Sequence, residues 1–228
     1  MNAAEAPPTP AALIDHTLLR PDATAAELRQ LCAEAAAFGF HAVCVNPLWV
    51  AVARRALAAA PVAVCSVVAF PFGATPAANK AAEAARAVAD GAAEIDMVIA
   101  IGALKAGDHD AVRADIAAVR RAVPAVLLKV IIEAALLTEA EKIAACTLAV
   151  AAGADFVKTS TGYGGGGATI ADVALMRRIV GPAIGVKASG GIRAKAVANA
   201  MIAAGASRIG ASASLALIGA AAAETGIY

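Results

Sequence analysis

The stretch that decides the fold reads Phe156-Val157-Lys158-Thr159-Ser160-Thr161-Gly162-Tyr163. It has the composition of a short buried strand that runs into a glycine-bearing turn, and a lysine stands inside the strand. A near copy follows later in the chain, as Gly185-Val186-Lys187-Ala188-Ser189-Gly190-Gly191. Lysine is almost never fully buried unless it has a partner. Two such strands therefore indicate an active site that uses amines and lies inside a barrel of strands.

Length and composition bound the classes of protein to which the chain can belong. The chain has 228 residues, of which 61% are hydrophobic and 16% are charged. A chain of this size buries roughly 70% of its unfolded surface, so it can build a substantial core. The formal net charge is +1 and the basic residues are scattered along the chain, which disfavours a nucleic-acid-binding face.

Two features exclude the membrane and secretory classes. The longest uncharged run lies between Arg55 and Lys80, but its apolar part covers only residues 62–70. That is too short to cross a bilayer as a helix. Residues 1–10 carry Glu5 and three prolines and lack a basic segment followed by an apolar one, so we expect a disordered arm and no signal peptide.

The cysteines and histidines predict neither a metal nor a disulfide framework. Four cysteines form no CxxC pair and have no histidine at metal-ligand spacing. Buried, reduced thiols in a cytoplasmic protein are the expectation. The histidines form no metal constellation either, although one of them is expected at the end of the first strand, near the site. The residues concerned are Cys32, Cys44, Cys65, Cys146, His16, His41 and His109.

Strand-like and helix-like segments alternate along the whole chain. Thr24 with Glu27, and Thr138 with Glu141, form capping boxes that begin two of the helices. We expect strands at 13–17, 42–46, 62–70, 94–99, 125–133, 156–160, 185–189 and 208–212. We expect helices at 24–38, 48–60, 75–90, 108–123, 138–152, 169–180 and 194–204, and a last alanine-rich helix after residue 212.

This order predicts an α/β protein, a single-domain (β/α)8 TIM barrel over residues 11–228. Short, continuously apolar strands are typical of a parallel sheet covered by helices, and eight strand–helix units fit the length of such a barrel. The alternative is an open doubly wound sheet, which usually carries a glycine fingerprint after its first strand. The run from Gly162 to Gly167 matches that fingerprint in part, but it follows the sixth strand. A phosphate-binding or lid loop is the better interpretation.

Strand parity places the charged residues on one face. Lys158 and Lys187 share the inward parity of their strands, as do the acids of the fourth strand. Crowded and desolvated lysines are expected to have lowered pKa values, and an uncharged amine attacks carbonyl groups. A purely structural ion-pair network remains the alternative, above all for Lys129 and Glu133. The expected interior set is Asp96, Lys129, Glu133, Lys158 and Lys187, and Glu94 has the same parity as Asp96.

Small, glycine-rich turns follow the last three strands. They are Thr161-Gly162, Gly190-Gly191 and Gly210-Ala211-Ser212. In TIM barrels the loops after strands seven and eight are the usual phosphate site. We therefore expect phosphate to bind there, with Arg193 as a further source of positive charge; ordinary turn geometry is the alternative.

Seven motifs in this order resemble the deoxyribose-phosphate aldolase family. The resemblance runs from Leu13 to Ser212. The motifs are Ile14-Asp15-His16-Thr17-Leu18-Leu19, Ala42-Val43-Cys44-Val45-Asn46-Pro47, Val68-Ala69-Phe70-Pro71-Phe72-Gly73, Glu94-Ile95-Asp96-Met97-Val98, Leu128-Lys129-Val130-Ile131-Ile132-Glu133, Phe156-Val157-Lys158-Thr159-Ser160-Thr161-Gly162 and Val186-Lys187-Ala188-Ser189-Gly190-Gly191-Ile192-Arg193.

The resemblance implies a class I aldolase that acts in deoxyribose phosphate catabolism without a cofactor or metal. It would cleave 2-deoxy-D-ribose 5-phosphate reversibly to acetaldehyde and D-glyceraldehyde 3-phosphate. Lys158 would be the Schiff-base lysine, Asp96 the carboxylate that transfers protons, and Lys187 the neighbour that keeps Lys158 nucleophilic. Asp15, Thr17, Lys129 and Tyr228 would support the site, and phosphate would bind at Gly162, Gly190, Gly191, Gly210 and Ser212.

Two departures and two rival interpretations accompany the resemblance. The family often has two serines in the last turn, where this chain has Ser212-Ala213-Ser214, and Tyr163 is followed by four glycines. The rivals are another Schiff-base barrel aldolase, and a catalytically silent barrel that binds phosphosugars. The expected partners are a phosphorylated sugar and small aldehydes. The sequence does not show the oligomeric state: a homodimer is one candidate assembly because dimers are common among such barrels, and no stretch identifies an interface.

Overall fold

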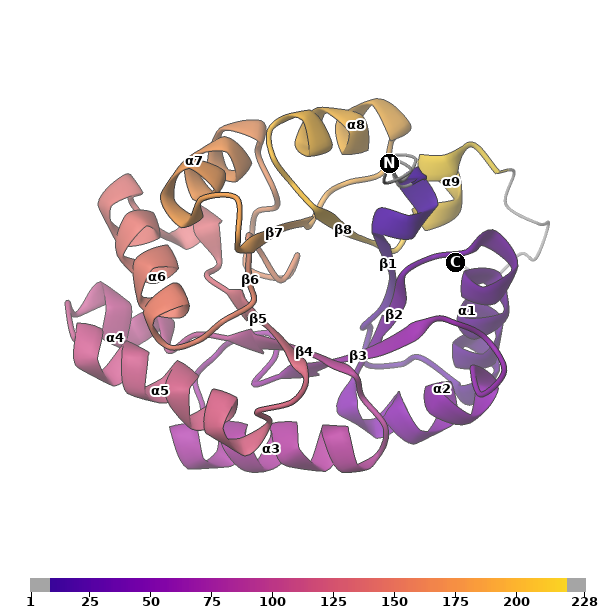
Figure 1. The fold of residues 1–228 in the computed structure, drawn as a ribbon, viewed down its shortest axis with the longest axis horizontal. Helices are drawn as coiled ribbons and strands as arrows, with labels where there is room; N and C mark the ends of the chain where they lie inside the picture. Colours follow the sequence, from indigo (N-terminus) through magenta and orange to yellow (C-terminus); the bar gives the residue numbers. More distant parts are fainter. Residues whose placement is uncertain (1–8, 221–228) are drawn as a thin grey trace, which may run out of the picture.

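Eight parallel strands close into a barrel in the order of the sequence (Figure 1). The structure is a computed structural model and describes residues 9–220. This closed sheet confirms the predicted (β/α)8 barrel and excludes the open doubly wound sheet. The strands are β1 (Ile14–Leu18), β2 (Ala42–Val45), β3 (Ala63–Val68), β4 (Glu94–Val98), β5 (Leu127–Ile131), β6 (Phe156–Lys158), β7 (Gly185–Ser189) and β8 (Arg208–Ala211).

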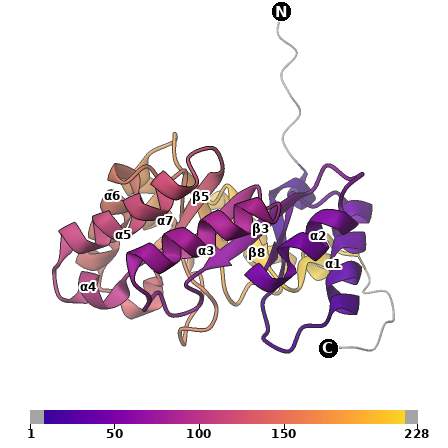
Figure 2. The ribbon, with the colours of Figure 1, turned by 90° about the horizontal axis from the view of Figure 1, so that it is seen from below.

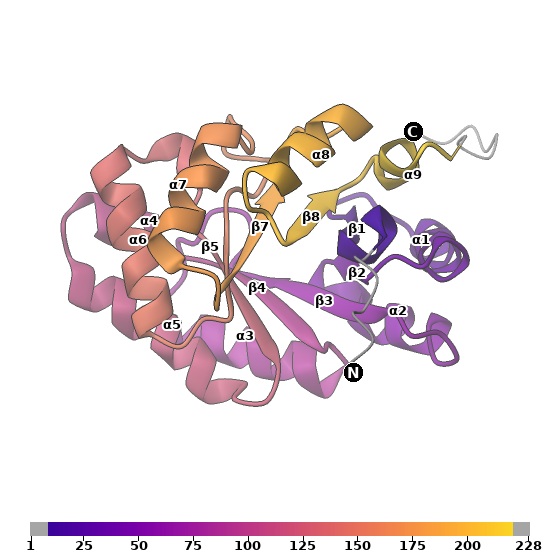
Figure 3. The same ribbon diagram turned by 45° about the horizontal axis from the view of Figure 1, so that its top comes forward.

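Helices cover the outside of the barrel and alternate with the strands. Figure 2 shows α1, α2 and α3 crossing the outer face of the sheet, and Figure 3 shows α7 and α8 outside β7 and β8. The α-helices are α1 (Ala25–Phe38), α2 (Val50–Ala56), α3 (Ala77–Ala89), α4 (Ile101–Lys105), α5 (His109–Ala122), α6 (Glu139–Ala151), α7 (Ile170–Val180), α8 (Lys195–Ala203) and α9 (Ser214–Ile218). Short 3-10 turns are η1 (Pro10–Leu13), η2 (Pro47–Trp49) and η3 (Ala134–Leu136).

Local chemistry begins the helices where the sequence predicts. Both capping boxes are present: the Thr24 hydroxyl accepts from the Glu27 amide, and Thr138 pairs with Glu141 in the same way. These bonds satisfy backbone amides that have no partner inside the helix. Gly39 ends α1 in the left-handed region, at φ +67°, where a residue without a Cβ is not strained.

Three predicted details are wrong. The helix predicted at 75–90 begins only at Ala77, with Pro76 as its N-cap, and the short helix α4 was not predicted. The fifth strand was predicted to reach Glu133, but β5 ends at Ile131. Glu133 has a φ of +55°, which a β-strand cannot contain. The strand therefore turns away before Glu133 reaches the barrel interior.

The apolar core lies between the strands and the helices. Leu28 of α1 and Ile116 of α5 belong to one continuous cluster with outward-facing strand residues such as Ile95 and Met97. The inward-facing positions are mixed: charged groups gather inside the barrel beside a smaller apolar cluster that includes Cys44, Cys65 and Val67. No helix in the described part of the chain is long and apolar enough to cross a membrane.

Candidate active site

The strand register sets charged residues side by side inside the barrel. Asp96 of β4 is paired with Lys129 of β5, and Lys158 of β6 is paired with Lys187 of β7. In a parallel sheet, paired residues on neighbouring strands point to the same face. The parity argument from the sequence is thus confirmed for these four residues.

Asp96 is the centre of this cluster. Its Oδ2 atom accepts hydrogen bonds from Lys158 Nζ at 2.7 Å and from Lys187 Nζ at 2.8 Å. Its Oδ1 atom accepts from Lys129 Nζ at 2.7 Å. All four side chains are buried. One carboxylate therefore holds three lysine amines at contact distance.

A second group of charges supports the first from below. Asp15 binds Lys187 and accepts a hydrogen bond from Arg208 at 2.8 Å. Glu94 lies 2.6 Å from Lys129 and 3.1 Å from Arg208. The sequence analysis did not identify Arg208. The available signal was its parity: Arg208 lies two residues before Gly210 and therefore shares the inward face of β8.

The pKa values in the cluster contradict the expectation that crowded, buried lysines have lowered pKa values. Burial by itself raises the pKa of Asp96, but Lys129, Lys158 and Lys187 outweigh it and hold that pKa well below its usual range. Burial likewise lowers the pKa of Lys187, but Asp15 and Asp96 outweigh it and raise the pKa. The same balance raises the pKa of Lys129. The prediction that crowding lowers the lysine pKa values is therefore wrong for Lys129 and Lys187, because the carboxylates around each amine outweigh both burial and the neighbouring ammonium groups.

A cavity of about 370 Å³ opens above the cluster. Of the three lysines at Asp96, Lys158 is the one that lines it, while Lys129 and Lys187 are fully buried beneath. The wall also brings together every glycine of the predicted phosphate site. Its lining includes Thr17, Lys158, Thr161, Gly162, Tyr163, Gly190, Gly191, Arg193, Gly210 and Ser212.

Gly167, in the loop after β6, and Gly210, in β8, have close neighbours that leave little room for a side chain. A Cβ on Gly167 would lie 2.3 Å from the Gly190 carbonyl oxygen, and the Ala168 amide donates to that same oxygen at 3.1 Å. A Cβ on Gly210 would lie 3.0 Å from Lys187 Cε. The loop after β6 can therefore rest on the turn after β7, and Lys187 can pass beneath the turn after β8.

Glu133 lies elsewhere than predicted. Its carboxylate accepts hydrogen bonds from the Thr161 amide at 3.2 Å and from the Thr161 hydroxyl. Because its backbone has left the strand, it holds the loop after β6 and forms no hydrogen bond or ion pair with a lysine in the described structure. The expectation of Glu133 in the lysine cluster is therefore wrong.

The two serines after β8 have different surroundings. Ser212 lines the cavity, whereas Ser214 is fully buried and contacts His16 Nδ1 at 3.0 Å. The Ser214 hydroxyl therefore cannot serve as a second phosphate ligand. At the opposite rim, Tyr163 is half-exposed and packs edge-on against Phe70, with ring centroids 5.4 Å apart.

The cysteines are all free and buried, as predicted. The ligand atoms of Cys44, Cys65 and Asp96 lie within 4.8 Å of one another, a group that the sequence did not indicate. Lys129 Nζ is 3.3 Å from Cys65 Sγ and also binds Asp96. This positive charge works against a metal ion at that place.

Comparison with known proteins gives the family. A family model described as DeoC/LacD family aldolase matches residues 10–222. The chain belongs to the DeoC/LacD family of aldolases. It is 63% identical to a deoxyribose-phosphate aldolase of Rhodospirillum rubrum over 217 residues, which cover 95% of this chain and 91% of that protein. It is 56% identical to one of Brevibacillus brevis over 205 residues, which cover 90% and 93%.

A solved structure of this aldolase family has the same fold. The tetrameric deoxyribose phosphate aldolase of Aeropyrum pernix matches with a TM-score of 0.86 and 33% identity, over 92% of this chain and 89% of that one. In this chain, Thr17, Lys158 and the predicted phosphate-binding residues line one cavity, and Asp15, Asp96, Lys129 and Lys187 are buried inside the barrel. Tyr228, predicted to assist proton transfer, lies outside the described residues, as do residues 1–8 of the predicted N-terminal arm.

Proposed function

We propose that this chain is a deoxyribose-phosphate aldolase that cleaves 2-deoxy-D-ribose 5-phosphate reversibly to acetaldehyde and D-glyceraldehyde 3-phosphate. The observation that carries the proposal is the Lys158–Asp96 contact, with Nζ and Oδ2 2.7 Å apart at the floor of the cavity. An amine beside a proton-accepting carboxylate fits Schiff-base chemistry. Membership of the family and the named relatives support the substrate.

The reaction begins when the neutral amine of Lys158 adds to the C1 aldehyde. The adduct takes up one proton from solvent and loses water, which gives a protonated imine. Asp96 then accepts the proton of the C3 hydroxyl, directly or through a water molecule. The C2–C3 bond breaks, its electron pair moves into the imine, and glyceraldehyde 3-phosphate departs. Asp96 returns a proton to C2 of the resulting enamine. Hydrolysis of the imine releases acetaldehyde and restores the amine.

The residues around this pair have positioning roles in the proposal. Lys129 and Lys187 hold Asp96 as a carboxylate, since both lie within hydrogen-bond distance of it. Asp15 holds Lys187 in turn, and Thr17 lines the cavity. Gly162, Gly190, Gly191, Gly210 and Ser212 would bind the phosphate with backbone amides and one hydroxyl, because they share the cavity wall with Lys158.

The setting of the enzyme is part of the same proposal. We infer one aldolase domain over residues 11–228 and a cytoplasmic location, which the four free cysteines support. A homodimer is expected to be the assembly, with the tetramer of the Aeropyrum pernix relative as the alternative. Tyr228 stays a predicted proton-transfer residue.

Trapping the imine tests the function directly. Borohydride added with acetaldehyde should inactivate the protein and leave a two-carbon adduct on Lys158, read by mass spectrometry of the peptides. Lys158→Arg is the matched control and should take up no adduct. An unmodified Lys158 peptide with activity intact would rule out the imine mechanism, and an unmodified peptide without activity is the result expected of the silent barrel. Efficient use of dihydroxyacetone phosphate in place of acetaldehyde would instead favour another aldolase.

A further inference from the structure

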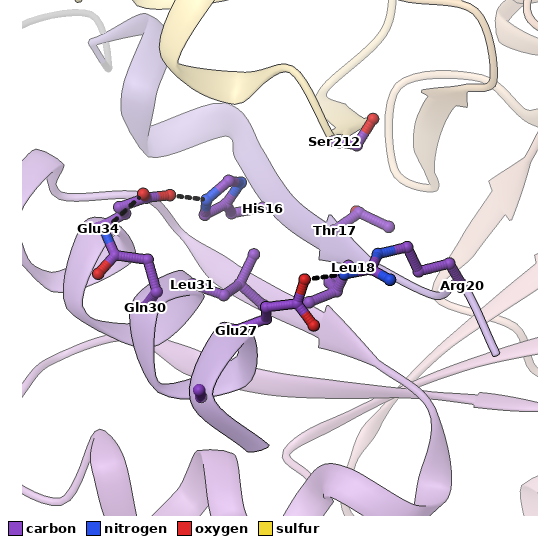
Figure 4. Close-up of a pocket in the computed structure, with 10 residues that line it drawn as sticks. His16, Thr17, Leu18, Arg20, Glu27, Gln30, Leu31, Glu34 and Ser212 are labelled. Atoms are coloured by element: carbon purple, nitrogen blue, oxygen red, sulfur yellow. Dashed lines mark hydrogen bonds and ion pairs between the residues drawn. The ribbon is translucent and has the colours of Figure 1, made fainter. Parts of the chain in front are cut away.

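A second cavity, of about 220 Å³, lies between β1 and α1 (Figure 4). It shares Thr17, Leu18, Arg20 and Ser212 with the substrate cavity, so the two are neighbours across one thin wall. The proposed reaction uses none of the polar groups on its far side. His16 stands among them, on the outward face of β1.

His16 joins three elements that are distant in the sequence. Its Nε2 atom lies 2.8 Å from Glu34 Oε2 on α1, and its Nδ1 atom lies 3.0 Å from Ser214 Oγ at the start of α9. Ser214 and His16 are buried, and Glu34 is 12% exposed where it meets the cavity. The imidazole ring packs at 5.1 Å from the ring of Phe40. We call Ser214, His16 and Glu34 the histidine chain.

The histidine chain ends at the phosphate turn. Ser214 Oγ lies 2.9 Å from the carbonyl oxygen of Ala211, and Ala211 is the register partner of His16 in the β1–β8 pair. Ser212 lies between Ala211 and Ser214 in the sequence, within the turn that this contact spans. A bond from Ser214 back to Ala211 closes this turn and so fixes the direction in which Ser212 faces the substrate cavity.

The number of protons on His16 and Glu34 determines which hydrogen bonds Ser214 can form. A serine hydroxyl has one proton and a neutral imidazole has one N–H. Ser214 can donate to Ala211 and still bond His16 only when Nδ1 is the donor. A second proton must then lie between Nε2 and the Glu34 carboxylate. With one proton fewer, Nε2 donates to Glu34 and Ser214 must choose between Nδ1 and Ala211.

Few charged residues of the described structure lie near the His16 ring. Glu34 on α1 is the partner, Glu27 on α1 and Arg20 after β1 stand farther along the same cavity wall, and the strand neighbours Val43 and Ala211 carry no charge. Burial lowers the pKa of His16, and Glu34 opposes that shift. The ring therefore loses its second proton as the pH rises out of the acidic range.

We propose that the histidine chain is a positioning device for the substrate phosphate, which holds the turn at Ser212 most firmly when the chain carries both protons. The inference rests on the proposed aldolase function. Ser214 itself is no nucleophile, because its hydroxyl is fully buried. The histidine chain acts on the binding of the phosphate and leaves the chemistry at Lys158 unchanged.

Steady-state kinetics of Ser214→Ala with two sugars test the proposal. The KM for 2-deoxyribose 5-phosphate should rise about fivefold, the effect of one lost hydrogen bond, with kcat nearly constant. Cleavage of unphosphorylated 2-deoxyribose should not change. Glu34→Gln should show the same pattern more weakly. Ser207→Ala is the matched control: this serine accepts from the Val186 amide at 3.1 Å before β8, at the far end of the strand, and its loss should leave both sugars unaffected.

The pH profile separates positioning from a merely structural bond. The ratio of KM values, Ser214→Ala over wild type, cancels the titration of the substrate phosphate and should fall as the pH rises. A flat ratio, an unchanged KM, or equal losses with both sugars would each overturn the proposal. A wild-type protein that cleaves neither sugar would overturn the proposed function, and this inference with it.

Discussion

Two buried lysine–aspartate pairs in this protein have the same contact distance and different surroundings. Lys80 of α3 and Asp115 of α5 lie outside the barrel, with Nζ and Oδ2 2.7 Å apart. Lys158 and Asp96 lie inside it, also at 2.7 Å. Lys80 has no part in either cavity described above. Burial of a lysine therefore does not by itself mark an active site.

The number of partners distinguishes the pairs. Lys80 has one carboxylate and the Val98 carbonyl, and burial lowers its pKa beyond what Asp115 restores. Burial also raises the pKa of Asp115, so neither charge is fully compensated. In the barrel, Asp96 faces three ammonium groups, and its pKa moves down. The outer pair joins two helices, whereas the inner cluster keeps a carboxylate charged beside a solvent-accessible amine.

The largest expected effect is on the inner pair. Lys158→Leu should lower kcat/KM by about 10⁴-fold or more, as is usual when a covalent nucleophile is removed, because no other lysine lines the cavity in the described structure. Retro-aldol assays with a coupled dehydrogenase measure this. The free energy of unfolding should change little by comparison. Residual activity above one-tenth of wild type would show that the amine is not essential.

The outer pair should respond in the opposite way. Lys80→Met leaves Asp115 buried without its cation, which should reduce the free energy of unfolding by about 3–5 kcal/mol. The specific activity of the folded protein should stay the same. Urea denaturation and kinetics below the transition measure the two quantities. The double variant Lys80→Met with Asp115→Leu should recover part of the lost stability. A loss of activity without a loss of stability would contradict a purely structural role for the outer pair.

Lys187 belongs to the inner cluster but does not line the cavity, so its effect should be intermediate. Lys187→Leu should reduce kcat about 10²-fold, within the range for a group that supports proton transfer, while the fold survives. Because Lys187 helps to hold the pKa of Asp96 down, its loss should move the acidic limb of the pH–rate profile to higher pH. Near-full activity would mean that Lys187 does not tune the site.

The smallest expected effect is on the pH dependence of the free energy of unfolding, which should change gradually in acid. Burial raises the pKa values of Asp15, Glu94 and Asp96, but their partners outweigh it and lower all three. These partners are lysines and Arg208 at Asp15, His41, Lys129 and Arg208 at Glu94, and three lysines at Asp96. Carboxyl groups with lowered folded-state pKa values stabilise the fold above about pH 4, and this is lost as the pH falls. Urea denaturation should therefore show stability that falls below about pH 5.

Two asparagine variants test the sign of that slope. Asp96→Asn removes a group with a lowered pKa and should make the slope shallower. Asp115→Asn removes a group with a raised pKa, which binds more protons when folded than when unfolded, and should make the slope steeper. Equal slopes in both variants would contradict the difference between the two pairs.

Much of the inner site follows from local periodicity. Lys158, Lys187, Asp96 and Lys129 share an inward face because side chains alternate along every strand, and this needs only the strand boundaries. The helix starts at Thr24 and Thr138 follow from bonds over three residues. Lys80 had no such signal, because its partner Asp115 is supplied by a different helix.

Other features depend on contacts between residues that are far apart in the sequence. Arg208 reaches Asp15 across 193 positions, and His16 reaches Ser214 across 198. The direction of the lysine pKa shifts depends on how many carboxylates surround each amine, and Glu133 turns away because its backbone has a positive φ. The sequence by itself determined the barrel, its inward faces and the family motifs, since these arise from short-range repeats. Tertiary structure decided the charge balance and the histidine chain, because electrostatic and hydrogen-bond energies depend on distance in space.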